Sequence, residues 1–203
     1  MKISTAAFTL LELLVVIAII AVLASLAYAG AGSMIGRSQT VKCLSNMRQI
    51  GAAAQMFAAE NNGRLPGTSH GVSWTNSLAA YLGPKFIGKC PGAPDNLARV
   101  AYGWNDSLAD VGGNGIKLAS CRTPNSTMAA AELSPDQTSE HFHFSGVRGG
   151  AARVTPNQFK SAVNVEAHER AANYLFVDGH AENLAWSAVQ SRLTRVGTTF
   201  IVP

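Results

Sequence analysis

Cysteines and charged residues are scarce in this sequence. It contains 3 cysteines, and charged residues make up 14% of its 203 residues. Cys43, Cys90 and Cys121 do not have the spacing of a metal-binding motif. In an oxidising compartment they would form one disulfide and leave one free thiol, and the sequence leaves all three pairings open.

Signatures of catalysis and of nucleic-acid binding are absent as well. The sequence has no Gly-x-Ser-x-Gly, no His-Glu-x-x-His and no P-loop. Its net charge of +4 is scattered along the chain, and no stripe combines basic with aromatic residues. We therefore expect no enzymatic activity, no cofactor and no nucleic-acid partner.

One long apolar segment lies near the N-terminus. It covers residues 8–29, and 22 residues in a helix extend about 33 Å, enough to cross a bilayer. Glu12 lies inside this segment, although a carboxylate in a membrane is costly and needs a cationic partner. The segment therefore predicts a membrane-spanning helix in which Glu12 has a function.

The residues around Glu12 resemble the N-terminus of type IV prepilins and type II secretion pseudopilins. The matching residues are Phe8-Thr9-Leu10-Leu11-Glu12-Leu13-Leu14-Val15-Val16. The resemblance implies that a prepilin peptidase cleaves between Ala7 and Phe8 and methylates the new amine of Phe8. It also implies that Glu12 pairs with the Phe8 amine of a neighbouring subunit during fibre assembly. The family usually has Gly before the cleaved bond, where this chain has Ala7.

Two other interpretations of the apolar segment remain open. Ala27-Tyr28-Ala29 fits the cleavage site of an ordinary signal peptide, and the segment could also be a plain signal anchor. Against a signal peptide, residues 8–29 exceed the roughly 7–15 apolar residues that are usual there, and Glu12 suits neither alternative. The basic residues after the segment favour the cytoplasm for that side, but the prepilin motif is the more specific signal.

The N-terminal helix is expected to continue beyond the membrane segment. Apolar residues recur at steps of three and four, at Val41, Leu44, Met47, Gly51, Ala54 and Ala58. Asn61-Asn62-Gly63 then ends the helix with a usual C-terminal signal. The expected organisation is a leader peptide at 1–7, a transmembrane half of the helix at 8–29, a soluble half at 30–62 and a periplasmic globular domain at 63–203.

The globular domain is expected to contain short elements and a C-terminal hairpin. A helix is predicted at 74–82, a turn at 112–115, and short strands at 117–120, 127–133 and 140–144. Strands at 173–177 and 180–186 flank Asp178-Gly179, which favours a two-residue type I′ turn with Val177 opposite His180. The fold class is therefore α+β, with the long N-terminal helix packed on a small, mainly antiparallel sheet.

A second resemblance covers most of the chain. His168, nine further residues and Asp178-Gly179 are similar to the His-x9-Asp-Gly domain found at the C-terminus of many pilin-like proteins. Other matching residues are Cys43-Leu44-Ser45-Asn46-Met47-Arg48-Gln49-Ile50, Trp74 and Cys90-Pro91. The resemblance implies no known enzyme activity and a disulfide between Cys43 and Cys90. The residues themselves favour a structural role, with Asp178 and Gly179 in a turn and His168 bonding a loop backbone.

A metal site is the main alternative for these residues. His168, Asp178 and His180, with His141 and His143, are suitable zinc ligands, and a calcium loop near Asp178 is a further option. The predicted hairpin, however, places His168 and Asp178 at opposite ends of a strand.

These observations favour a pilin-like or pseudopilin-like structural subunit. The expected partners are prepilin peptidase, other pilin or pseudopilin subunits and the bacterial inner membrane, with the C-terminal domain in the periplasm. The alternative is a secreted or membrane-anchored metal-dependent enzyme that uses the His/Asp cluster.

Overall fold

The computed structural model describes residues 9–69, 71–83, 86, 88–91, 101–110, 112–144 and 154–203, with side chains left out at 27, 29–31 and 33. The chain divides into two compact units, Met1–Ser38 and Gln39–Pro203. The predicted cleavage site at Ala7 and Phe8 lies outside the described residues.

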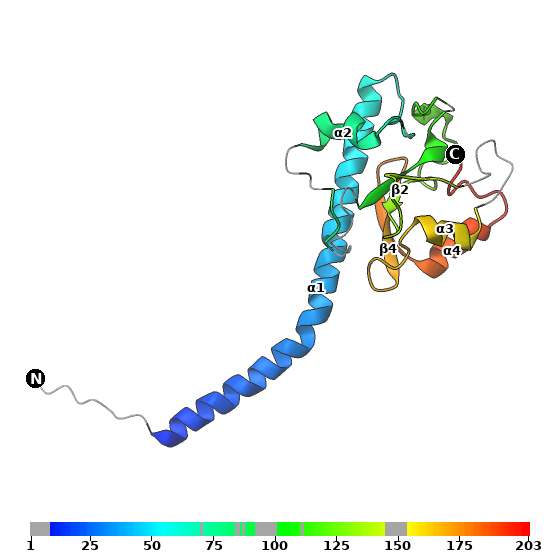
Figure 1. Ribbon diagram of the computed structural model, residues 1–203. Helices are drawn as coiled ribbons and strands as arrows, with labels where there is room; N and C mark the ends of the chain where they lie inside the picture. Colours follow the sequence, from blue (N-terminus) through cyan, green and yellow to red (C-terminus); the bar gives the residue numbers. More distant parts are fainter. Residues whose placement is uncertain are drawn as a thin grey trace, which may run out of the picture. The chain divides into compact units, whose positions relative to one another are not determined.

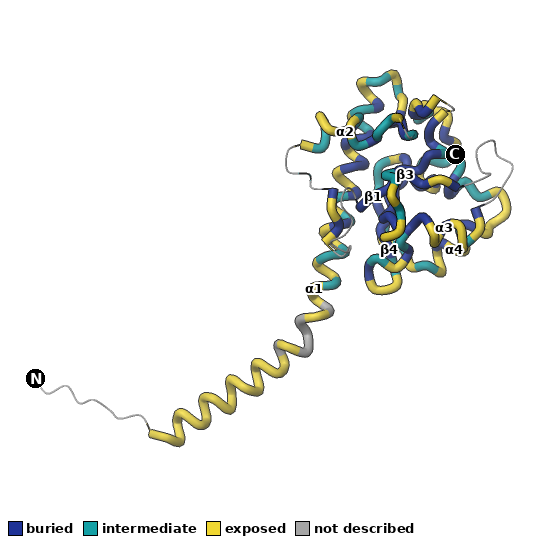
Figure 2. Tube along the Cα trace, viewed as in Figure 1, coloured by how far each residue is buried: buried dark blue, intermediate teal, exposed yellow. Residues whose placement is uncertain are grey.

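Helix α1 (Leu10–Glu60) begins in the first unit. Its large apolar side chains from Leu10 to Leu26 are all exposed, and the trace of this part of α1 is yellow, the colour of exposed residues, in Figure 2. Among the described residues, no helix meets the length and hydropathy that a membrane span requires.

The described residues of the second unit form the rest of α1, a sheet and three further helices. The sheet has five strands in the order β3-β1-β2-β4-β5. Its strands are β1 (Tyr102–Asn105), β2 (Met128–Glu132), β3 (His141–Phe142), β4 (Ala171–Phe176) and β5 (Ala181–Ala185). The helices are α2 (Trp74–Leu82), α3 (Pro156–Ala162) and α4 (Trp186–Thr194), and two 3-10 turns are η1 (Asp106–Leu108) and η2 (Leu118–Ser120).

Most strand pairs in this sheet are antiparallel. β2 pairs in this way with β1 and β4, and β4 pairs in the same way with β5. β1 and β3 form a short parallel pair, so the sheet is mixed. The predicted α+β class, with a helix packed on a mainly antiparallel sheet, is confirmed.

Two apolar clusters cover the two faces of the sheet. One lies between the sheet and α1 and includes Met47, Ile50 and Leu175. The other lies under α3 and α4 and includes Tyr174 and Phe176. Successive residues of β4 thus face opposite sides, as the pleat of a strand requires, and Figure 1 shows α1 on one side of β4 and α3 with α4 on the other. β4 is the inner strand that its apolar sequence predicted.

The soluble part of α1 buries one face and ends where predicted. Met47 and Ala54 of the predicted stripe are buried, whereas Val41 is 65% exposed and does not belong to it. After Glu60 the backbone turns left-handed at Asn62 (φ 55) and Gly63 (φ 74). The amide of Gly63 donates to the carbonyl of Ala58 at 2.8 Å, which closes the helix end.

The hairpin loop differs from the predicted two-residue turn. Leu175 pairs with Ala181, and the amide of Gly179 donates to the carbonyl of Phe176 at 2.9 Å. Gly179 has φ 92, but Asp178 is not among the residues with positive φ. The predicted type I′ turn and the pairing of Val177 with His180 are therefore wrong, because the loop has three residues with the glycine in the left-handed position.

A turn with two left-handed residues occurs at the other end of β4. Glu169 (φ 47) and Arg170 (φ 77) both have positive φ. His168 and Ala171 on either side exchange two backbone hydrogen bonds, of 2.8 and 2.9 Å. This turn fixes the position of His168 relative to β4.

Other predicted elements had mixed outcomes. Helix α2 matches its prediction, and β2 falls inside the predicted strand at 127–133. The strand predicted at 117–120 is wrong, because Leu118–Ser120 forms a 3-10 turn. The strand predicted at 140–144 is reduced to His141–Phe142. β1, α3 and α4 were not predicted.

Candidate functional site

Glu12 and Thr9 cap the first turn of α1. The carboxylate of Glu12 accepts hydrogen bonds from the backbone amide and the hydroxyl of Thr9, each at 2.9 Å. The Thr9 hydroxyl accepts from the amide of Glu12 at 3.2 Å. This reciprocal arrangement is a capping box, and the pattern Thr-x-x-Glu before an apolar run could have predicted it. Both residues are exposed, so another chain can reach the carboxylate.

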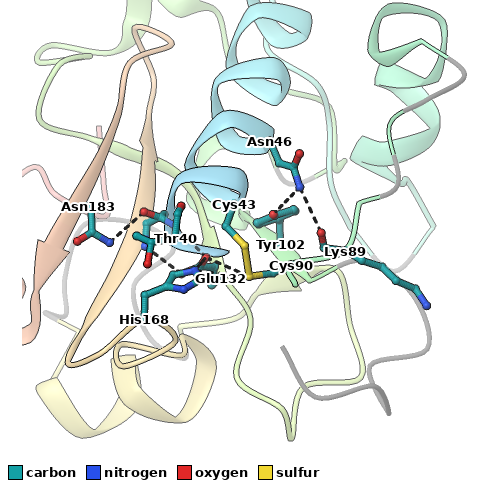
Figure 3. Close-up of polar contacts among 10 residues, drawn as sticks. Thr40, Cys43, Asn46, Lys89, Cys90, Tyr102, Glu132, His168 and Asn183 are labelled. Carbon is teal, nitrogen blue, oxygen red and sulfur yellow. Dashed lines mark hydrogen bonds and ion pairs between the residues drawn. A yellow bond between two sulfur atoms is a disulfide. The ribbon is translucent and has the colours of Figure 1, made fainter. Parts of the chain in front are cut away.

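A second polar site lies deep in the globular unit. Glu132 of β2 and His168 are 3% and 2% exposed in their side chains, and Glu132 Oε1 lies 2.7 Å from His168 Nε2. Asn173 of β4 donates to the same carboxylate from its backbone amide at 2.9 Å and from its side chain at 3.1 Å. Figure 3 shows this cluster beside α1.

The bonds within this cluster hold a buried carboxylate that would otherwise be costly. Its oxygens accept hydrogen bonds from Asn173 and contact the ring of His168. These contacts offset the free-energy cost of removing the carboxylate from water. Burial raises the pKa of Tyr102 and of Tyr174, and the negative charge of Glu132 raises both further. Both phenols therefore stay neutral at physiological pH.

Asn173 also connects the cluster to α1. Its side-chain nitrogen donates to the carbonyl of Thr40 at 3.3 Å. Its side-chain oxygen accepts from Asn183 of β5 at 3.0 Å. Glu132 was not recognised in the sequence, although it is a carboxylate inside the apolar run 128–133, which is itself a signal of a buried polar role.

The disulfide of the protein lies against this cluster. Cys43 of α1 is joined to Cys90, with their Cα atoms 5.3 Å apart. This is the pairing that the second resemblance implies. The sulfur of Cys90 lies 3.5 Å from His168 Nε2 and 3.7 Å from Glu132 Oε1. Cys121 is a free, buried thiol.

Asn46 lies in the stretch 43–50 that matches the second resemblance, and it holds the chain next to Cys90. Its side-chain nitrogen donates to the carbonyl of Lys89 at 3.2 Å and to the hydroxyl of Tyr102 at 3.0 Å. One turn of α1 therefore carries both the disulfide and a polar contact to the neighbouring loop.

The Asp178-Gly179 loop lies at the other end of β4 from His168. Asp178 Oδ1 accepts from the amide of His180 at 3.1 Å and lies 2.5 Å from its ring Nδ1. The loop packs on α1, where Gln55 donates to the carbonyl of Val177 at 2.8 Å.

The role expected of His168 was wrong in one respect, because its ring binds Glu132 and not a loop backbone.

The remaining predicted metal ligands form a separate group. His141 Nε2 lies 2.7 Å from His143 Nε2, and His143 Nδ1 lies 2.9 Å from Asp106 Oδ2. Among the described residues, the cluster with the ligand types and spacing for a metal ion is Cys43, Cys90, Glu132 and His168. The structure thus does not bring His168 together with Asp178, His180, His141 and His143.

Comparison with known proteins adds one finding. The model of the prokaryotic N-terminal methylation motif family matches residues 4–28. No curated protein and no solved structure matches the chain. The matched residues include Ala7, Phe8 and Glu12, so the comparison supports a pilin-like or pseudopilin-like protein.

Proposed function

We propose that this chain is a structural subunit of a type II secretion pseudopilus or of a type IV pilus-like fibre. Prepilin peptidase cleaves it between Ala7 and Phe8 and methylates the new Phe8 amine. Residues 8–29 hold the subunit in the bacterial inner membrane and later enter the fibre core. The match to the N-terminal methylation motif over residues 4–28 is the observation that carries this proposal.

Charge pairing explains what Glu12 contributes to assembly. In the low dielectric of a helix bundle, an unpaired carboxylate and an unpaired amine are both costly. The Glu12 carboxylate of one subunit neutralises the Phe8 amine of its neighbour. A subunit added in the wrong register leaves both charges unpaired. The pairing therefore also sets the register of the subunits in the fibre.

The exposed apolar surface of α1 supports this assignment. Monomeric soluble proteins rarely leave large apolar patches in water. Leu10, Leu11, Ile20, Leu23 and Leu26 are between 58% and 82% exposed. Membrane lipid covers this surface before assembly, and the helices of neighbouring subunits cover it afterwards.

The second unit is the periplasmic part, and we assign it to the His-x9-Asp-Gly type. A disulfide between Cys43 and Cys90 suits an oxidising compartment. The two ends of the motif hold β4: His168 binds Glu132, and the loop at Gly179 packs on α1. The motif therefore fixes the domain on the helix that enters the fibre.

Mass spectrometry of the mature N-terminus tests the proposal. We expect a chain that begins with methylated Phe8. An N-terminus at Gly30 would instead support an ordinary signal peptide, and an intact Met1 would support a plain signal anchor.

The alternative function is a secreted or membrane-anchored metal-dependent enzyme. It requires His168 and Asp178 in one site, and these residues lie at opposite ends of β4. Metal content of the purified, disulfide-bonded chain separates the two functions. Stoichiometric zinc that is lost in Asp178→Ala would favour the enzyme.

A further inference from the structure

Four potential metal ligands lie together in the globular unit, and two of them are the cysteines of the disulfide. Cys43, Cys90, Glu132 and His168 each offer one donor atom, and these atoms all lie within 4.8 Å of one another. All four residues are buried. Two sulfurs, one imidazole nitrogen and one carboxylate oxygen are ligand types that zinc accepts.

Two of the distances among these atoms already fit a tetrahedral site, and two others must change. Zinc binds sulfur at about 2.3 Å and nitrogen or oxygen at about 2.0–2.2 Å, so neighbouring ligand atoms lie about 3.3–3.8 Å apart. The sulfur of Cys90 lies 3.5 Å from His168 Nε2 and 3.7 Å from Glu132 Oε1. The sulfurs must separate, and the 2.7 Å contact between His168 and Glu132 must lengthen by roughly 0.6 Å or more.

The surroundings would hold the carboxylate in place as a ligand. Glu132 Oε2 accepts from the backbone amide of Asn173 at 2.9 Å, whereas Oε1 faces the sulfur and the imidazole and accepts from the side-chain nitrogen of Asn173 at 3.1 Å. Asn173 is itself held by Thr40 and Asn183. Hydrogen bonds to a ligating carboxylate of this kind orient it and tune its affinity for metal.

We propose that Cys43, Cys90, Glu132 and His168 form a redox-dependent zinc site. The oxidised chain holds the disulfide and has no thiolates to offer. The reduced chain binds one Zn²⁺ at the same place. Either state ties α1, through Cys43, to the loop that carries Cys90.

A dithiol reductant converts the oxidised state into the reduced state. Two electrons and two protons from the dithiol split the S–S bond into two thiols, and the dithiol becomes a disulfide. Zn²⁺ then displaces both thiol protons to solvent, because the thiolate is the ligating form. A chain whose cysteines are not yet oxidised would therefore acquire zinc.

Cobalt titration of the purified full chain in detergent micelles tests this proposal. Co²⁺ replaces Zn²⁺ in such sites and gives visible bands for tetrahedral geometry and a sulfur-to-cobalt charge-transfer band in the ultraviolet. We expect the chain reduced with a phosphine to bind one equivalent with the intensity of two thiolate ligands, and excess Zn²⁺ to bleach the bands. The disulfide-bonded chain should show no such bands.

Matched variants locate the site. His168→Gln and Glu132→Gln should weaken binding to the reduced chain by at least about 100-fold, more than the loss of a supporting residue usually costs. Cys121→Ser should bind like the wild type, because Cys121 lies outside the cluster. Circular dichroism of each disulfide-bonded variant shows that it folds.

Failure of the reduced wild type to bind cobalt would overturn the proposal without reference to any variant. Undiminished binding in a folded His168→Gln chain would overturn it too. Neither result bears on the mature N-terminus, so the proposed assembly function is tested separately.

Discussion

Gly51 of α1 lies against the backbone of Gly179 in the β4–β5 loop. A Cβ atom on Gly51 would lie 2.6 Å from the carbonyl oxygen of Gly179 and 2.8 Å from Leu175 Cδ1. The helix and the hairpin loop therefore approach more closely than any side chain at position 51 permits. Together with the bond from Gln55 to Val177, this contact fastens the C-terminal end of β4 to α1.

Gly51→Ala should lower the free energy of unfolding by about 1–3 kcal/mol, the usual cost of overpacking. The methyl group meets the Gly179 carbonyl oxygen, which is backbone and cannot move aside easily. Better helix propensity returns about 1 kcal/mol at most. Denaturant unfolding of the full chain in micelles measures the change.

Gly32→Ala is the matched control, since Gly32 is also in α1 but a Cβ atom there would have nothing within 4 Å. It should leave stability unchanged or raise it slightly. Equal effects at both positions would contradict the close contact at Gly51.

Gly179→Val should also destabilise the second unit, by about 1–3 kcal/mol. Gly179 has φ 92, a region that a β-branched side chain resists, and its Cβ would lie 3.3 Å from Gln55 Cγ. Gly179→Asn should cost less, because Asn tolerates left-handed backbone. Thermal unfolding of both variants should rank them in this order, and the reverse order would contradict the assigned backbone conformation.

His168→Ala should cost more than Gly179→Val, on the order of 3–5 kcal/mol. Removing the ring leaves the buried carboxylate of Glu132 without the partner that lies 2.7 Å away. His180→Ala is the control, because His180 has 37% of its side chain exposed and its carboxylate partner is also partly exposed. Chemical denaturation of the oxidised chain compares them, and a similar small loss for both would argue against a buried Glu132–His168 pair.

Arg170→Gly should stabilise the chain by about 0.5–1 kcal/mol, because relief of left-handed backbone strain exceeds the entropy that glycine adds to the unfolded chain. Arg170 has φ 77 and is exposed, so glycine relieves backbone strain without removing a buried contact. Arg195→Gly is the control, since Arg195 has φ −63 and glycine there only adds freedom to the unfolded chain. Stabilisation by both substitutions would show that strain at Arg170 is not the cause.

Local signals made part of this fold predictable. The end of α1 follows from Asn61-Asn62-Gly63, and the inner position of β4 follows from its apolar residues on both faces. α3 carries a capping box between Thr155 and Gln158 that the sequence displays but that was not predicted.

Long-range pairings were not predictable in the same way. Glu132 and His168 are 36 residues apart, and nothing local indicates that they meet. The 3-10 turn at 118–120 is likewise set from afar, since Leu118 donates to the carbonyl of Gly63 across the chain. Tertiary contacts of this kind override the weak strand preference of a four-residue segment.

Glu12→Leu should enter membranes more readily than the wild type and yet fail to join a fibre. Leucine removes the carboxylate that pairs with the neighbouring Phe8 amine, and it also removes the capping bonds to Thr9. Glu12→Gln separates these two effects, because glutamine can serve in a capping box but carries no charge. We expect a milder assembly defect for Glu12→Gln, measured as the fraction of subunit in sheared fibres relative to the membrane fraction. Normal incorporation of Glu12→Leu would show that the intersubunit charge pair is not needed. If Glu12→Gln assembled like the wild type while Glu12→Leu did not, the defect would come from the lost capping bonds to Thr9.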